Sequence, residues 1–162
     1  MTAFTVWKFE DPRGAEHASS LLKDAQHEGL VQIMDHAVVS WPVGAKHPTT
    51  KHGHDATRRG TGWGIFWGLM FGMLFAVPVI GAAAGAAGGA FAKMRDGLGI
   101  TDEQLDRIRD EVTEGTSALF LVTEEADLDR LGERMRGVFT RLVDTNLTDA
   151  ERSMLTEAMG AS

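Results

Sequence analysis

The chain has 162 residues, a length that allows one domain with an insertion or two small units. It contains no cysteine, which excludes disulfides, cysteine-ligated iron–sulfur clusters and thiol nucleophiles. The formal net charge is -7, and residues 93–162 carry the excess of acidic side chains, which argues against a nucleic acid as partner.

The first part of the chain alternates between strand and helix patterns. In the strand expected first, Phe4 and Val6 lie on one face, and Trp7 and Phe9 lie on the other. The elements expected here are a strand over residues 3–9, a helix that ends at Gly29, a strand over residues 31–41 and a short edge strand over residues 46–51.

Residues 60–92 contain no charged side chain, and glycine recurs among them at helical spacing. Pro78 lies between two glycine triplets and predicts a turn, because proline lacks the donor needed to continue a helix. The pattern predicts a glycine-zipper helical hairpin whose small faces serve helix packing and oligomerisation. The glycines of these faces are Gly64, Gly68, Gly72, Gly81, Gly85 and Gly89.

The length of this stretch favours a hairpin in a membrane. Its 33 residues would extend about 50 Å as one helix, whereas a hydrocarbon core is about 30 Å thick. Basic residues at both ends predict that both ends stay on the cytoplasmic side, and tryptophans near the entry are typical interfacial anchors. The residues predicted at the membrane interface are Arg58, Arg59, Trp63, Trp67, Lys93 and Arg95.

The last part of the chain returns to an α+β pattern. Capping boxes at Thr101–Gln104 and Thr148–Glu151 predict two helix starts. Between these helices, the sequence predicts a strand over residues 117–123, a helix over residues 128–135 and a strand over residues 138–143. The whole chain is therefore expected to be α+β, a ferredoxin-like sandwich interrupted by the apolar hairpin. Its expected parts are residues 1–57, the hairpin at 58–95, and residues 96–162.

Three histidines lie close together before the apolar stretch. His47, His52 and His54 are candidate metal ligands because imidazole suits Zn, Ni and Cu. Lysines and arginines surround them and would repel a cation, so no metal site is predicted and a solvated basic edge is favoured. No cofactor is expected either, since the glycine-rich segment lacks a phosphate-loop lysine.

Three segments carry a resemblance to a known family. They are FTVWKF at the start, GWGIFWGLMFGMLFAVPVIGAAAGAAGGA in the apolar stretch, and DGLGITDEQLDRIRDEVTEGTSALFLV after it. On these segments the chain resembles an uncharacterised bacterial family of small membrane proteins, the domain of unknown function 1269. The resemblance implies the fold and a membrane location, and it supplies no reaction and no catalytic residue.

These observations predict a structural protein without enzymatic activity. The protein would insert its hairpin into the bacterial inner membrane, keep its soluble domain in the cytoplasm and form a homo-oligomer, with the lipid membrane and itself as partners. One alternative is a soluble, cytoplasmic homo-oligomeric scaffold that buries the hairpins in its interior. Another is a small ligand or metal sensor that uses the histidine-rich loop.

Overall fold

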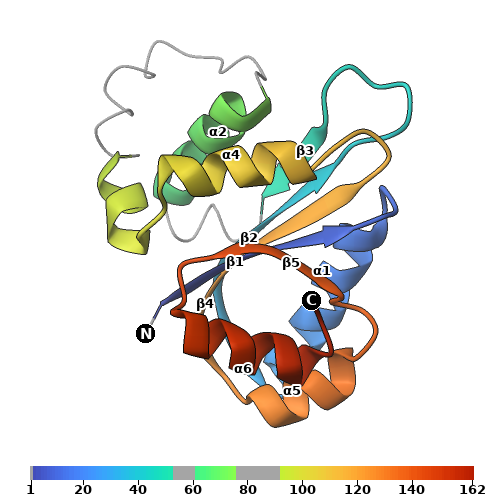
Figure 1. The fold of residues 1–162 in the computed structure, drawn as a ribbon, viewed down its shortest axis with the longest axis vertical. Coiled ribbons are helices and arrows are strands. Elements are labelled where there is room, and N and C mark those ends of the chain that lie inside the picture. Colours follow the sequence, from blue (N-terminus) through green and yellow to red (C-terminus); the bar gives the residue numbers. More distant parts are fainter. Residues whose placement is uncertain (1, 53–60, 76–91) are drawn as a thin grey trace.

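The computed structural model describes residues 2–52, 61–75 and 92–162, and it has helices on both faces of one sheet (Figure 1). Residues 92–98 are also helical. The elements in chain order are β1 (Ala3–Phe9), α1 (Gly14–His27), β2 (Val31–Ser40), β3 (Thr49–His52), α2 (Thr61–Phe75), α4 (Asp102–Glu111), β4 (Ser117–Ala126), α5 (Leu128–Met135), β5 (Arg141–Thr145) and α6 (Asp149–Met159).

The sheet has five strands in the order β3-β2-β4-β1-β5, and every neighbouring pair is antiparallel. The central pair of strands joins the N-terminal and C-terminal parts of the chain, because Ala3 of β1 pairs with Thr123 of β4. The first six residues of β4 are buried without alternation, as expected for a strand covered on both faces. The chain is thus α+β, as the sequence predicts.

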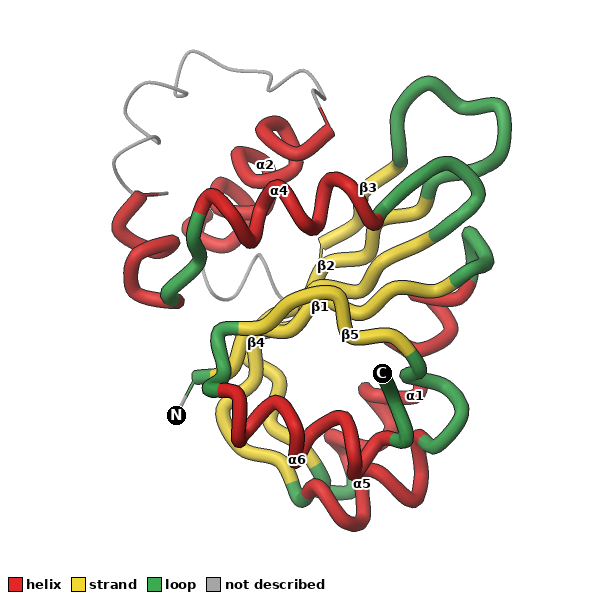
Figure 2. Tube along the Cα trace, in the orientation of Figure 1, coloured by secondary structure: helices red, strands yellow, loops and turns green. Residues whose placement is uncertain are grey.

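Two helical layers cover the sheet, and we name its faces after them (Figure 2). The α2 face lies under α2 and α4, and the α1 face lies under α1, α5 and α6. Strand β1 divides its side chains as its alternation predicts. Phe4 and Val6 belong to the core of the α2 face, whereas Trp7 and Phe9 belong to that of the α1 face.

Aromatic side chains of α2 form the centre of the core on the α2 face. Trp67 stacks on Phe71 with ring centroids 5.8 Å apart, and Phe71 meets Phe120 of β4 edge-on at 5.1 Å. The indole N–H of Trp67 donates a hydrogen bond of 3.0 Å to Oδ2 of Asp35 on β2. Burying one such side chain contributes about 1.5–3 kcal/mol, so α2 is a structural layer of the domain.

The predicted apolar helical hairpin is wrong. Within the described residues, the apolar stretch holds one helix that ends at Phe75, and the guanidinium of Arg109 on α4 binds that end. Its Nε donates to the carbonyl oxygen of Leu74 at 3.1 Å, and its Nη2 donates to that of Met73 at 3.0 Å. The uncharged sequence of α2 accords with its place on the sheet, beside α4. Pro78, the predicted hairpin turn, lies outside the described residues.

The predicted membrane insertion and the predicted transmembrane helix are wrong as well. Among the described helices, none combines the length and the apolar character that a membrane crossing requires. The 15 residues of α2 extend about 22 Å, which is short of a hydrocarbon core of about 30 Å. The strong apolar signal of this segment comes from packing on a sheet that is buried on both faces.

Local signals at helix ends are confirmed. Both predicted capping boxes are present, with Thr101 and Gln104 at the start of α4 and Thr148 and Glu151 at the start of α6. Gly29 follows α1 with a φ of 78°, a left-handed conformation that glycine adopts without strain. Strand β5 begins three residues later than expected, at Arg141.

Candidate functional site

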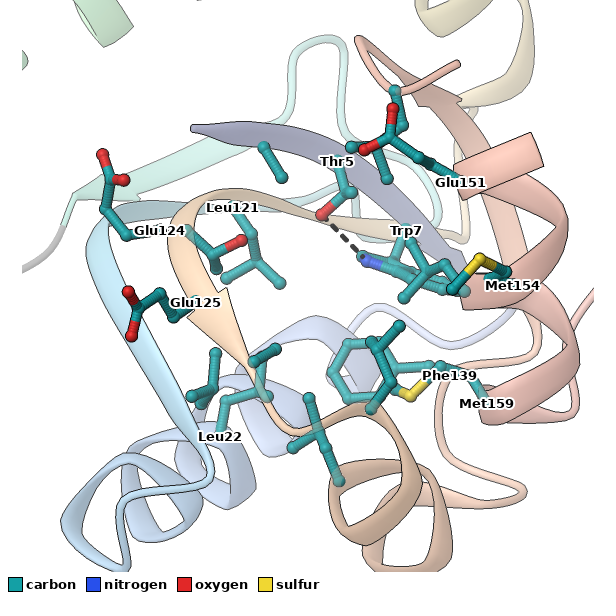
Figure 3. A pocket seen from close by; sticks show the side chains of 18 residues that line it. Thr5, Trp7, Leu22, Leu121, Glu124, Glu125, Phe139, Glu151, Met154 and Met159 are labelled. Atoms are coloured by element: carbon teal, nitrogen blue, oxygen red, sulfur yellow. Dashed lines mark hydrogen bonds between the residues drawn. The ribbon is translucent and has the colours of Figure 1, made fainter. Parts of the chain in front are cut away.

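A cavity of about 310 Å³ lies between the α1 face of the sheet and the helices α5 and α6 (Figure 3). Sites for small organic molecules begin at about this size and are lined mainly by apolar side chains. Residues on six surrounding elements contribute to its wall. They include Thr5 and Trp7 of β1, Leu22 of α1, Val31 of β2, Leu121 and Thr123 of β4, Leu128 and Leu131 of α5, and Met154, Leu155 and Met159 of α6, with Phe139 from the α5–β5 connection.

The way α5 and α6 pack leaves this space open. The two helices lie tightly together, whereas their backbones make few close approaches to the strands. Gly132 of α5 faces the backbone of α6 so closely that a Cβ atom there would lie 2.1 Å from the carbonyl oxygen of Ala158. The two helices therefore pack more closely on each other than on the sheet. Side chains fill the space between this helix pair and the sheet only in part.

The floor of the cavity is mainly apolar and includes the hydroxyl group of Thr5. Trp7 and Phe139 meet edge-on with ring centroids 5.2 Å apart, and both side chains are buried. The indole N–H of Trp7 donates to Oγ1 of Thr5 at 3.1 Å, drawn as the dashed line in Figure 3. The polar atom of the tryptophan is thus satisfied inside the protein, and its ring is presented as an apolar surface.

The rim of the cavity carries three carboxylates. Glu124 and Glu125 lie near the end of β4, and Glu151 lies in the first turn of α6, on the other side of the opening (Figure 3). Oε1 of Glu124 accepts a hydrogen bond of 2.7 Å from the hydroxyl of Thr2. Oε1 of Glu151 accepts the capping bonds from the amide and the hydroxyl of Thr148, at 3.2 Å and 2.8 Å.

No lysine, arginine or histidine is among the described side chains that line the cavity. The charges in its wall are therefore all negative, and they lie at the rim where water still reaches them. This arrangement places a negative potential over an apolar interior.

A second polar group lies at the edge of the sheet, outside the cavity wall. The side chain of Asp144 on β5 is 2% exposed, its Oδ1 accepts from the amide of Thr145 at 2.8 Å, and Nε of Arg107 lies 3.4 Å from its Oδ2. Oδ2 accepts no hydrogen bond within the described residues. Burial raises the pKa of Asp144, and the Thr145 amide and the guanidinium of Arg107 oppose that rise.

The structure describes only part of the predicted glycine faces. Gly64, Gly68 and Gly72 lie in α2, whereas Gly81, Gly85 and Gly89 lie outside the described residues. A Cβ atom at Gly68 would have no described neighbour within 4 Å. The role of these glycines in helix packing and oligomerisation stays a prediction.

The residues predicted at a membrane interface are dispersed. Trp67 is fully buried in the core of the α2 face, and Trp63 lies in the first turns of α2. Lys93 is exposed, and Arg95 donates from Nε to the carbonyl oxygen of Ile100 at 3.0 Å. Arg58 and Arg59 lie outside the described residues.

The histidine-rich loop forms no metal site in the part of the chain that the structure describes. His47 is exposed in the β2–β3 connection, His52 pairs with Ala37 at the end of β3, and His54 lies outside the described residues. In residues 2–52, 61–75 and 92–162, no group of three or more histidine or carboxylate side chains is placed to hold a metal ion.

The cavity is not apparent from the sequence. Its α6 wall was visible as the apolar positions Met154 and Leu155, but such positions normally predict core packing. A stronger signal was the pair Met154 and Met159 on a short terminal helix, since methionine suits surfaces that adapt to a ligand. Asp144 was missed because an aspartate inside a strand pattern predicts the end of the strand.

Comparison with known proteins places the chain in a family. No curated protein and no solved structure was found to match it. A family profile described as "Protein of unknown function (DUF1269)" matches residues 61–160, from the first residue of α2 to the C-cap of α6. Because the match covers well over half of the chain, this protein belongs to the DUF1269 family of proteins of unknown function.

Proposed function

We propose that this protein binds a small, largely apolar molecule in the cavity between the α1 face and the pair α5–α6. The observation that carries the proposal is the cavity itself, about 310 Å³ with an apolar wall. Protein interiors are normally packed with few voids larger than a water molecule. Aromatic rings interlock in the core of the α2 face, whereas the described side chains of the α1 face leave this space open.

The side chains of α6 support a binding role. Met154 is 59% exposed at the opening although methionine is apolar, whereas Met159 is buried deeper in the wall. Unbranched methionine side chains adjust their shape at low cost, so they can close around ligands of different outline. An exposed methionine at the opening of an apolar cavity therefore suits the entry of a ligand.

The wall chemistry suits binding without a chemical step. The cavity is lined by no histidine, lysine or cysteine, and its ionisable groups are the three glutamates of the rim. A general base needs to reach the reacting group, and these carboxylates lie at the opening rather than at the floor. Self-association, the absence of a nucleic-acid partner and the cellular location stay predictions.

Methyl NMR tests the proposal, because methionines mark both faces of the sheet. The probe is 2-(1-naphthyl)ethanol, a neutral aromatic molecule, titrated into protein with ¹³C-labelled methionine methyl groups. The signals of Met154 and Met159 in the cavity wall should shift in a saturable manner. The signals of Met70 and Met94, which pack on the α2 face, should not move.

A matched pair of variants locates the site. Leu155→Trp fills the cavity from α6, whereas Leu69→Trp adds the same bulk to a half-buried position of α2 on the opposite face. We expect Leu155→Trp to weaken the probe at least about tenfold and Leu69→Trp to leave its affinity unchanged, because only the first removes volume from the site. Circular dichroism checks that both variants are folded. Equal binding by the two variants, or no shift of the cavity methionines in the unmodified protein, would contradict the proposal.

A further inference from the structure

We infer that the ligand of this cavity is an organic cation, an apolar body that carries an ammonium group at the rim. The inference rests on the proposed function and adds the chemical class of the ligand. The juxtaposition that carries it is an apolar interior under an opening whose lining side chains bear only negative charge.

Two of the rim carboxylates are placed to meet such a group. Glu125 is exposed at the end of β4, and Glu151 is half-buried at the start of α6, so the two flank the opening from different elements. Both hydrogen bonds that Glu151 accepts end on its Oε1. Its Oε2 can accept from an ammonium group while the capping box stays intact.

The helix N-terminus at the rim does not reverse this preference. The first turn of a helix carries a partial positive charge of about half an elementary charge. In α6 that turn already contains Asp149 and Glu151, two full negative charges. The ionisable side chains that line the opening therefore remain negatively charged, which disfavours an anionic ligand and favours a cationic one.

The rim also differs from a metal site. A divalent cation needs several oxygen ligands gathered around one point. Among the described residues, no group of three or more carboxylate or histidine side chains is gathered in this way. Carboxylates spread around an apolar opening suit an organic cation, since its charge and its apolar body are recognised by different parts of the site.

Three probes with one naphthalene body separate charge from shape. They are 2-(1-naphthyl)ethylamine, which is positively charged at neutral pH, neutral 2-(1-naphthyl)ethanol, and negatively charged 1-naphthylacetate. At low ionic strength we expect the amine to bind about fivefold more tightly than the alcohol, as expected for a partly exposed ion pair. The acetate should bind more weakly than the alcohol, and added salt should reduce the differences.

Substitutions at the rim test the source of the preference. The double variant Glu125→Gln/Glu151→Gln should lose most of the preference for the amine and keep the affinity for the alcohol. Glutamine at position 151 preserves the capping box, as Gln104 does at the start of α4, where its Oε1 accepts from the amide of Thr101 at 2.8 Å. The control Glu157→Gln removes an exposed carboxylate of α6 outside the cavity wall and should keep the preference.

The outcomes distinguish the two proposals. If the alcohol shifts the cavity methionines but the amine binds no more tightly, the inference of a cationic ligand is wrong and the proposed function stands. If the full preference for the amine persists in the double variant, the two carboxylates placed to meet the ammonium group are not its source, and the inference also fails. If no probe shifts Met154 or Met159, the proposed function itself fails.

Discussion

Asp144 is a carboxylate held away from water at the edge of the sheet. Its side chain is 2% exposed, and the nearby guanidinium of Arg107 is more than half exposed. Removing a charged group from water is costly, and its partners, the amide of Thr145 and the partly solvated Arg107 among them, offset only part of that cost. The raised pKa of Asp144 reports this imbalance, because the neutral acid is the form that burial favours.

The pH dependence of stability should reveal this imbalance. Because the pKa of Asp144 is raised in the folded state, its contribution to stability is largest below its ordinary pKa. That contribution is lost as the pH rises through the raised folded value. Asp144→Asn does not titrate, so we expect the free energy of unfolding of the unmodified protein to fall relative to the variant between pH 3 and neutral pH. Urea denaturation of both proteins across this range measures the difference. A difference that stays constant, or one that changes in the opposite direction, would count against the raised pKa.

Helices α5 and α6 illustrate how one element is positioned by another. Gly132 allows their backbones to touch, with the carbonyl oxygen of Ala158 in the space that a Cβ atom would occupy. This contact sets where α6 stands over the sheet, and α6 supplies Met154, Leu155 and Met159 to the cavity wall. The size of the cavity therefore depends in part on this close approach between the two helices.

Gly132→Ala should force the two helices apart. Overpacking of this kind typically costs about 1–3 kcal/mol, so we expect a loss of that size in the free energy of unfolding. The methyl signals of Met154 and Met159 should shift even without a ligand, because α6 moves relative to the cavity floor. Denaturant unfolding and the methionine spectrum provide the two measurements.

Gly97→Ala is the matched control for this prediction. Gly97 lies in the helical segment 92–98, and a Cβ atom there would meet no described heavy atom within 4 Å. Alanine is about 1 kcal/mol more favourable than glycine in a helix, so this variant should be as stable as the unmodified protein or more so. Equal effects of the two substitutions would show that the helix contact at Gly132 is not tight.

The elements that the sequence predicts well are those whose signals are local. Capping boxes such as Thr101–Gln104 are local, so reading four residues suffices to locate the start of a helix. Strand β1 is also predicted with its correct faces, because alternation is a property of the strand itself. The cavity wall combines residues from Thr5 to Met159, and no local pattern reports that they meet.

For the whole molecule, the decisive feature is that both faces of the sheet are covered. The α2 face buries Phe66, Trp67 and Phe71 against strands from both ends of the chain. The sequence alone favours a membrane for this segment, because uncharged apolar helices occur both in bilayers and in fully buried layers. Only the three-dimensional arrangement distinguishes a helix in a bilayer from a helix in a buried layer. Here α2 has the sheet on one side and α4 beside it.

Phe71→Ala should therefore destabilise the entire domain. Truncation of a buried phenylalanine typically costs about 3–5 kcal/mol, and Phe71 is 2% exposed between Trp67 and Phe120. Met73→Ala is the control on the same helix, because Met73 is 47% exposed and its truncation should cost about 0.5 kcal/mol or less. Denaturant unfolding followed by circular dichroism compares them. Similar losses in both variants would indicate that α2 is not part of the core.

The pairing of β1 with β4 has a consequence for synthesis on the ribosome. Ala3 and Thr123 are partners in the central strand pair of the sheet. The sheet face on which α2 packs is therefore complete only after both residues have left the ribosome. Folds dominated by such distant pairings form slowly, and exposed apolar segments favour aggregation while they wait. The apolar surface of α2 is therefore exposed in the nascent chain until α4 and β4 have emerged. A chaperone would contribute most to the yield of folded protein during this interval.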